Sequence, residues 1–129
     1  KIENIMQGIS EVDFVFLPQV SQETILELYK KSSAVVMTPL SDGSPVSAME
    51  AMACGANVIL GPIQYDSQIF NTNVIKLLDW DAEKLAHLIT KATNQEHKVD
   101  VRSMDAIIDR TTEMKKLDYI YGMLLEKNK

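Results

Sequence analysis

The chain has 129 residues, 46% of them hydrophobic and 24% charged, and its formal net charge is −5. These values indicate one globular domain that folds without disulfides, and the acidic balance disfavours nucleic acid as a partner. No apolar run approaches the roughly 18 residues that span a bilayer, so we expect a cytoplasmic location, with a full-length form free to lie peripherally at the inner membrane face.

Four short apolar runs predict the strands of a sheet. They lie near residues 13–17, 34–37, 57–60 and 74–78. They barely alternate between apolar and polar residues, and helical segments separate them, as in parallel strands that are covered on both faces and joined by right-handed crossovers. The predicted fold class is therefore α/β, a Rossmann-like parallel sheet in a three-layer α/β/α arrangement.

Local signals predict where the helices begin and end. Ser21 is a suitable N-cap for the segment QETILELYKK, and a second helix should begin at about Pro45 and end before Gly55, a left-handed terminator. Asp81 can cap a third amphipathic helix. From residue 103 to about residue 126 the apolar residues keep helical period, which predicts a helical C-terminal tail.

The composition offers no pattern for a metal or redox site. Cys54 is the only cysteine, so no internal disulfide can form. The two histidines, His87 and His97, lack the spacing of zinc ligands. We expect no metal and no resident cofactor. The chain starts at Lys1 without a signal-peptide pattern, and we expect it to be a piece of a longer protein.

The stretch SDGSPVSAMEAMACG, residues 41–55, joins the end of a predicted strand to the start of a helix. Ligands of open α/β sheets lie beyond the carboxyl ends of the strands. The first turn of a helix has unpaired N–H groups and a partial positive charge. The backbone amides of Gly43, Ser44, Val46 and Ser47 can therefore hold phosphate oxygens.

Glu50 follows Ser47 by three positions and Gly43 by seven, so its carboxylate shares a helix face with these amides. A carboxylate in this place can accept two hydrogen bonds from the vicinal diol of a ribose. The same residues also suit an ordinary strand-to-helix connection, because Asp-Gly is a common turn and an isolated Glu on a helix is usually solvated. The residues alone leave both interpretations open.

Three segments in this order resemble the nucleotide-sugar half of retaining glycosyltransferases of the GT-B fold, in glycosyl transferases group 1, family four. The segments are VFLP, SQETILELYKKSSAVVMTP and SDGSPVSAMEAMACGANVI. Members share two acids eight positions apart, with Gly and Pro after the first. Here these acids are Asp42 and Glu50. The likeness is close over about residues 12–60. It implies that residues 1–129 form a single partial donor-nucleotide-binding domain, part of the C-terminal half of a GT-B fold.

By this resemblance Glu50 binds the donor ribose, Asp42 is the catalytic contact to the transferred sugar, and the amides of Gly43 to Ser47 face the sugar and the distal phosphate. The implied enzyme moves a sugar from a nucleoside diphosphate to a glycan, lipid-linked or protein acceptor, as in polysaccharide biosynthesis. The nucleotide sugar is a substrate, and no cofactor is implied. Asp42 departs from the family, in which the first acid is usually Glu, longer by roughly 1.5 Å.

Similar enzymes carry an acceptor domain, two strands and a basic glycine loop ahead of this region. We therefore expect the isolated fragment to be inactive, because helix-terminus attraction of about 0.3–1 kcal/mol does not hold a diphosphate tightly without cations. The two strands would separate residues 13–17 from residues 34–37. Either these segments pair directly, or self-association of two chains covers an exposed sheet edge.

Other classes of protein share parts of this pattern. A noncatalytic nucleotide-sugar-binding or scaffolding module would keep Glu50 but would no longer catalyse sugar transfer. The replacement of the usual Glu by Asp42 would then be a sign of this loss. A receiver-like signalling domain would need acids at successive strand ends, which are not evident. A nucleotide-sugar epimerase has the same type of fold but no supporting motif here.

Overall fold

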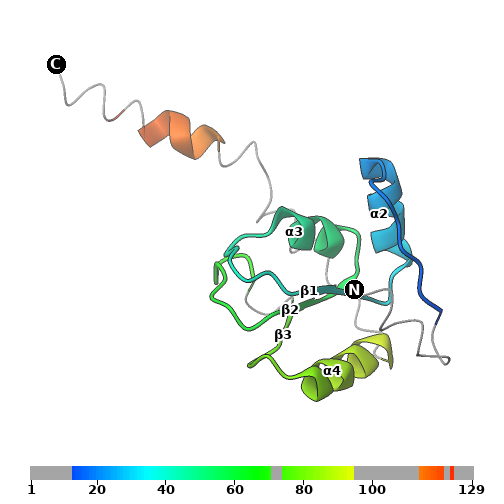
Figure 1. The fold of residues 1–129 in the computed structure, drawn as a ribbon. Coiled ribbons are helices and arrows are strands. Elements are labelled where there is room, and N and C mark those ends of the chain that lie inside the picture. The colour runs from blue at the N-terminus through cyan, green and yellow to red at the C-terminus, as the bar shows by residue number, and fades with distance from the viewer. Residues whose placement is uncertain (1–12, 71–73, 95–113, 121–122, 124–129) are drawn as a thin grey trace.

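Helices and strands follow one another along residues 22–94, and no described helix separates the last two strands (Figure 1). The computed structural model of the chain describes residues 13–70, 74–94, 114–120 and 123. In chain order the elements are α2 (Gln22–Lys31), β1 (Ala34–Met37), α3 (Val46–Ala53), β2 (Asn57–Leu60), β3 (Ile75–Lys76) and α4 (Ala82–Asn94). β1 and β2 cover the residues for which the sequence predicts strands, and β3 is shorter than the predicted 74–78.

The three strands form a parallel sheet in the order β1-β2-β3. The register places Val35 beside Val58, and Ile59 beside Ile75. Figure 1 shows α3 over one face of the sheet and α4 over the other, with α2 next to α3. The predicted α/β class with a parallel sheet is therefore confirmed. Both loops that leave the carboxyl ends of β1 and β2 lie at the same edge.

Side chains cap two of the helices as the sequence predicts. The Ser21 hydroxyl accepts a hydrogen bond from Thr24 N at 3.3 Å and starts α2. The Asp81 carboxylate accepts hydrogen bonds from Glu83 N at 2.9 Å and Lys84 N at 3.1 Å and starts α4. Each bond satisfies a first-turn N–H group that has no carbonyl partner within its own helix.

Backbone geometry, without a side-chain cap, sets the ends of α3. Pro45, predicted as the first helical residue, is instead the N-cap, with φ −63° and ψ 116°. Gly55 has φ 82°, a left-handed conformation that favours glycine, and it ends the helix. Gly55 N then donates to Met52 O at 2.9 Å, and Ala56 N donates to Ala51 O at 3.0 Å. The predicted terminator is confirmed.

An apolar core fills the space between α3 and the sheet. Small side chains on α3, Ala48 and Ala51, are fully buried and allow the helix to approach the strands closely. Ile59 is also buried but lies outside this cluster, as expected for a strand residue that points to the opposite face. The buried cluster consists of Ala48, Ala51, Met52, Ala56, Val58, Leu60, Tyr65 and Phe70.

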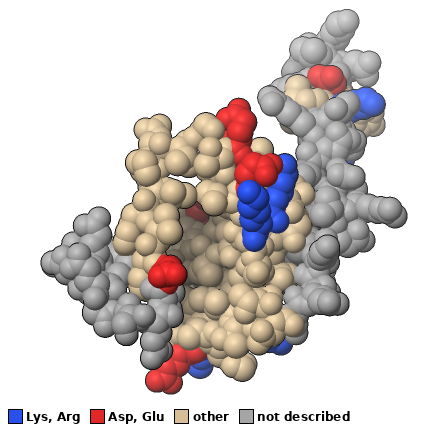
Figure 2. All heavy atoms as spheres, turned by 90° about the vertical axis from the view of Figure 1, so that its right-hand side faces the viewer, with Lys and Arg blue, Asp and Glu red and all other residues tan. Residues whose placement is uncertain are grey.

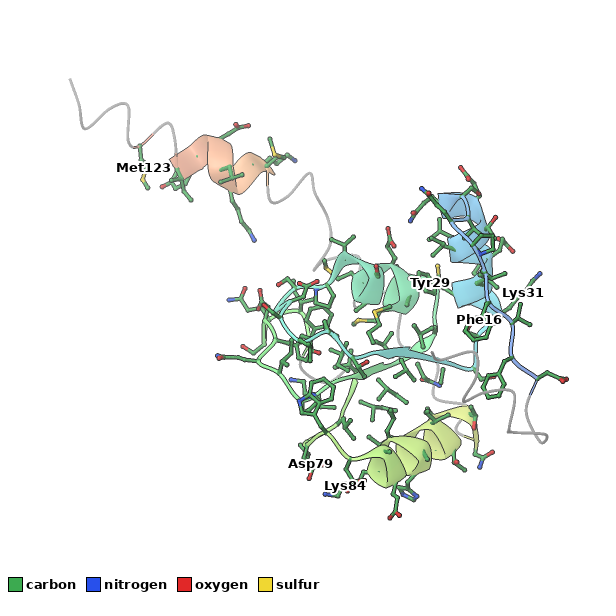
Figure 3. All side chains as sticks on the ribbon, in the orientation of Figure 1. Phe16, Tyr29, Lys31, Asp79, Lys84 and Met123 are labelled. Carbon is green, nitrogen blue, oxygen red and sulfur yellow. The ribbon has the colours of Figure 1, made fainter. Side chains whose placement is uncertain are left out.

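The first predicted strand is wrong. Residues 13–17 have no regular structure, and among the described strands β1 pairs with β2 alone, so 13–17 does not pair with 34–37. The apolar side chains of this segment are exposed, from 39% for Phe14 to 79% for Val15. Figure 3 shows Phe16 alongside α2. A strand needs N–H and C=O groups of a neighbouring strand, and the described residues supply none to this segment.

Most of the predicted helical tail, 103–126, lies outside the described residues. The described part, 114–120, is helical, and its side chains are exposed. None of the described helices, this one included, combines the length and apolarity needed to cross a membrane.

Candidate functional site

Two loops meet at the carboxyl edge of the sheet, one after β1 and one after β2. Asp66 N, in the second loop, donates a hydrogen bond to Gly43 O, in the first, at 2.9 Å. A Cβ atom on Gly43 would lie 3.4 Å from Gln64 O, so the two backbones are in contact there. Residues 42–44 and 64–66 therefore lie side by side next to the start of α3.

Asp42 and Ser44 form a tight local turn. The Asp42 carboxylate accepts a hydrogen bond from Ser44 N at 3.2 Å. Both residues are exposed. The Ser44 amide, predicted to hold a phosphate, is thus occupied by the predicted sugar contact. A ligand oxygen can take this amide only if the Asp42 side chain moves.

The first turn of α3 presents open donors. The N–H groups of Gly43, Val46 and Ser47 have no hydrogen-bond partner among the described residues. Val46 is 62% exposed, and Ser47 is also exposed. The positive end of the helix dipole adds to the attraction that these donors exert on an anion. Three of the four predicted amides are accordingly free to bind one.

Glu50 connects α3 with the start of α2. Its Oε1 accepts a hydrogen bond from Gln22 Nε2 at 2.8 Å, and Gln22 is the first residue of α2. The Glu50 side chain is half-buried. The described residues offer no hydrogen bond to Oε2, which leaves this oxygen free to accept one. Gln22 therefore orients the carboxylate that the sequence predicts as a ribose ligand.

Tyr65 lies beneath these loops and is 8% exposed. Its hydroxyl is buried and has no hydrogen-bond partner among the described residues. The nearby Gly61 N–H donates to Met37 O at 2.9 Å, so it does not satisfy this hydroxyl. Burial raises the pKa of Tyr65 above its usual value, and the negative charge of Asp42 raises it further, while the Gly61 N–H acts in the opposite direction.

This shift predicts a pH effect on stability. Because the pKa of Tyr65 is higher in the folded than in the unfolded chain, its contribution is complete below the ordinary value of 10.0 and is lost as pH rises through the folded pKa. Urea unfolding between about pH 9 and pH 11.5 should show a smaller alkaline loss in Tyr65→Phe, and a partial reduction in Asp42→Asn. Parallel losses in all three proteins would contradict the assignment.

The stretch of sequence that contains Asp42 and Glu50 carries no cation. No Lys or Arg occurs between Lys31 and Lys76. Two described lysines pair with acids elsewhere, Lys30 with Glu27 at 2.7 Å and Lys84 with Asp79 at 2.6 Å. Figure 2 shows lysines next to acidic side chains on the α2 face, and Figure 3 shows Asp79 and Lys84 at the start of α4. Within residues 32–75, the attraction for an anion therefore comes from the start of α3.

A hollow of about 500 Å³ lies elsewhere, between β3 and α4. Its walls are mainly apolar and include Leu77, Leu78 and Leu88, but none of the predicted site residues. Among the described residues no group of three His, Cys, Asp or Glu side chains is placed to hold a metal ion. The predicted site residues lie apart from this hollow, at the sheet edge, where Asp42, Ser44 and Ser47 are exposed.

The sequence pattern does not indicate two of the residues around this surface. Gln22 is 28 positions from Glu50, and only the packing of α2 against α3 brings them together. Tyr65 lies in a segment without a recognised motif, although a bulky aromatic residue after a glycine and a proline is a signal for a packed loop. The six residues that the sequence predicts for the site all lie on the predicted loop and helix: Asp42, Gly43, Ser44, Val46, Ser47 and Glu50.

Residues 9–113 match the family model described as Glycosyl transferases group 1. This range covers most of the chain and includes both loops, Asp42 and Glu50. No curated protein sequence matches the chain.

Proposed function

Because the chain belongs to the family of glycosyl transferases group 1, we propose that it is the donor-binding domain of a retaining GT-B enzyme of family four. The donor is a nucleoside-diphosphate sugar, and a hexosyl or related group moves to a glycan, lipid-linked or protein acceptor. One observation carries this proposal. The free amides at the start of α3 lie between Asp42 and a Glu50 carboxylate that another helix orients.

Glu50 is the proposed ribose ligand. Its Oε1 is held by Gln22, and its Oε2 is free to accept a hydrogen bond from a ribose hydroxyl. On binding, a second ribose hydroxyl either joins or replaces the Gln22 amide at Oε1. A half-buried carboxylate gains more from such bonds than a fully solvated one, because less water competes for it.

The helix start is the proposed diphosphate site. The N–H groups of Val46 and Ser47 point out of the first turn of α3, and Gly43 N is also free. The Gly43 position has no Cβ, so a ligand can approach the backbone closely. Phosphate oxygens at this position interact with both the donors and the helix dipole.

Asp42 is the proposed contact to the transferred sugar. In the reaction the bond from the anomeric carbon to the diphosphate oxygen breaks, and an acceptor oxygen bonds to that carbon. The acceptor proton leaves to the diphosphate or to solvent. Positive charge develops on the sugar ring in the transition state, and a fixed carboxylate stabilises it. The amides of α3 stabilise the diphosphate that departs.

The cations for the diphosphate come from another part of the full-length protein. The segment from residue 32 to residue 75 has neither Lys nor Arg. A helix terminus contributes about 0.3–1 kcal/mol, up to roughly 2 kcal/mol when partly buried, which is too little for tight binding of a diphosphate. The isolated 129-residue chain is accordingly inactive. Among the described strands β1 pairs on one side alone, so its other edge is the place where a strand from a second copy or from the rest of the protein would pair.

A noncatalytic nucleotide-sugar-binding module is the second candidate. The hydrogen bond from Ser44 N to Asp42 favours it, because a carboxylate held in a local turn is not presented to a sugar. In such a module Glu50 would bind the nucleotide and Asp42 would serve only the turn. Both candidates bind the nucleotide sugar, but only the enzyme transfers the sugar to an acceptor.

We expect Glu50→Gln to weaken the binding of UDP or GDP to the full-length protein by at least about tenfold. The variant loses charge-assisted hydrogen bonds to the ribose, each worth about 1.5–3 kcal/mol. Isothermal titration with UDP and with GDP measures the effect. Glu27→Gln is the matched control, because this exposed acid of α2 pairs with Lys30 at 2.7 Å. Unchanged affinity in Glu50→Gln would remove the ribose assignment.

A further inference from the structure

The Tyr65 hydroxyl is a buried polar group without a partner. The side chain is 8% exposed, and its ring meets Phe70 edge-on, with centroids 5.8 Å apart and planes at 64°. Among the described residues no atom accepts a hydrogen bond from the hydroxyl or donates one to it. Burying such a group without a hydrogen bond destabilises the fold, so the hydroxyl would gain free energy from a partner in another state of the site.

Asp42 is a candidate partner, because the next residue in the chain, Gly43, contacts both neighbours of Tyr65. Gly43, the residue after Asp42, accepts a hydrogen bond from Asp66 N at 2.9 Å, and Asp66 follows Tyr65. The contact between Gly43 and Gln64 O places the residue on the other side of Tyr65 against the same turn. The backbone therefore holds the turn that contains Asp42 beside the segment that carries Tyr65.

We propose that Tyr65 is a positioning residue for Asp42: when the donor binds, the Tyr65 hydroxyl donates a hydrogen bond to the Asp42 carboxylate, which leaves Ser44 N free for a phosphate oxygen. This inference rests on the proposed function and deepens it. The exchange of hydrogen-bond partners involves three residues, because the Asp42 carboxylate leaves the amide of Ser44 and binds the hydroxyl of Tyr65. Before binding, Asp42 accepts from Ser44 N at 3.2 Å and the hydroxyl is unpaired.

The exchange improves the hydrogen bonding of the site. Ser44 N gains a phosphate oxygen in place of the carboxylate, and the Tyr65 hydroxyl gains a partner that it lacked. It also reduces a repulsion, because a carboxylate beside a diphosphate is unfavourable unless a donor shields its charge. A tyrosine hydroxyl, with an ordinary pKa of 10.0, is protonated at neutral pH, so a proton is available for this hydrogen bond.

Titrations of the full-length protein with two pairs of probes test the exchange. UDP and GDP contain the diphosphate, whereas uridine and guanosine lack it. We expect Tyr65→Phe to weaken UDP or GDP binding by about tenfold and to leave the nucleoside affinity unchanged. A loss of packing alone would weaken both ligands of a pair. Tyr65→Phe keeps the ring and its contact with Phe70, and its melting temperature should equal or exceed that of the unaltered protein.

A second variant isolates the partner. In Asp42→Ala nothing occupies Ser44 N, so adding Tyr65→Phe should change UDP or GDP affinity by less than about twofold. The inference is overturned if Tyr65→Phe alone leaves diphosphate binding unchanged, or if it weakens nucleoside binding equally. When that happens while Glu50→Gln still weakens binding, the proposed function stands and only the role of Tyr65 fails. If the unaltered protein binds neither UDP nor GDP, the donor proposal fails, and this inference with it.

Discussion

In the full-length enzyme proposed above, replacing Asp42 by alanine should lower the turnover number of sugar transfer by about 100- to 1000-fold, the range found when one preorganised group that stabilises transition-state charge is removed. The loss falls on kcat, because the carboxylate acts on charge that develops only as the bond to the diphosphate breaks. Donor affinity should not fall, since Asp42→Ala releases Ser44 N and removes a negative charge beside the phosphates. UDP-glucose and GDP-mannose are suitable donors, with release of UDP or GDP as the measurement.

Asp79→Ala is the control for this substitution. Asp79 is an exposed acid that pairs with Lys84 at 2.6 Å, next to α4 and apart from the loop that carries Asp42. An exposed ion pair contributes about 0–1 kcal/mol to stability, so kcat should remain within about twofold. If Asp42→Ala also keeps kcat within that range, Asp42 does not act on the sugar. Binding of UDP or GDP without any turnover in the unaltered protein would favour the noncatalytic module.

Short-range signals in the sequence predict much of this fold. The apolar runs of β1 and β2, the caps Ser21 and Asp81, and the terminator Gly55 each depend on a few adjacent residues. Such features are decided by local backbone and side-chain chemistry, which the sequence displays directly. The same holds for the part of the site that lies within one turn and one helix, from Asp42 to Glu50.

Features that depend on distant partners are not visible in the same way. The hydrogen bond from Gln22 to Glu50 forms only because α2 packs beside α3. That the hydroxyl of Tyr65 lacks a partner can be recognised only when the groups around it are known. Periodicity places Glu50 on a helix face but does not say which side chain approaches from another element. Residues 13–17 show the limit most directly, because their composition favours a strand whether or not a neighbouring strand exists.

Phe70→Ala should destabilise the protein by about 3–5 kcal/mol, a large share of the roughly 5–15 kcal/mol that stabilises a typical domain. Phe70 is fully buried, and its removal leaves a cavity beside Tyr65 and the cluster under α3. For a chain of this size the melting temperature should fall by roughly 10–20 °C.

Phe16→Ala is the matched substitution, because Phe16 is 53% exposed in the irregular segment 13–17. Removing a half-exposed ring from an irregular segment that pairs with no described strand should cost within about 0.5 kcal/mol. Urea unfolding of both variants compares the two sites directly. A loss for Phe16→Ala as large as that for Phe70→Ala would mean that residues 13–17 are packed in solution. The strand that the sequence indicates would then form against a partner, either a second copy or the rest of the full-length protein.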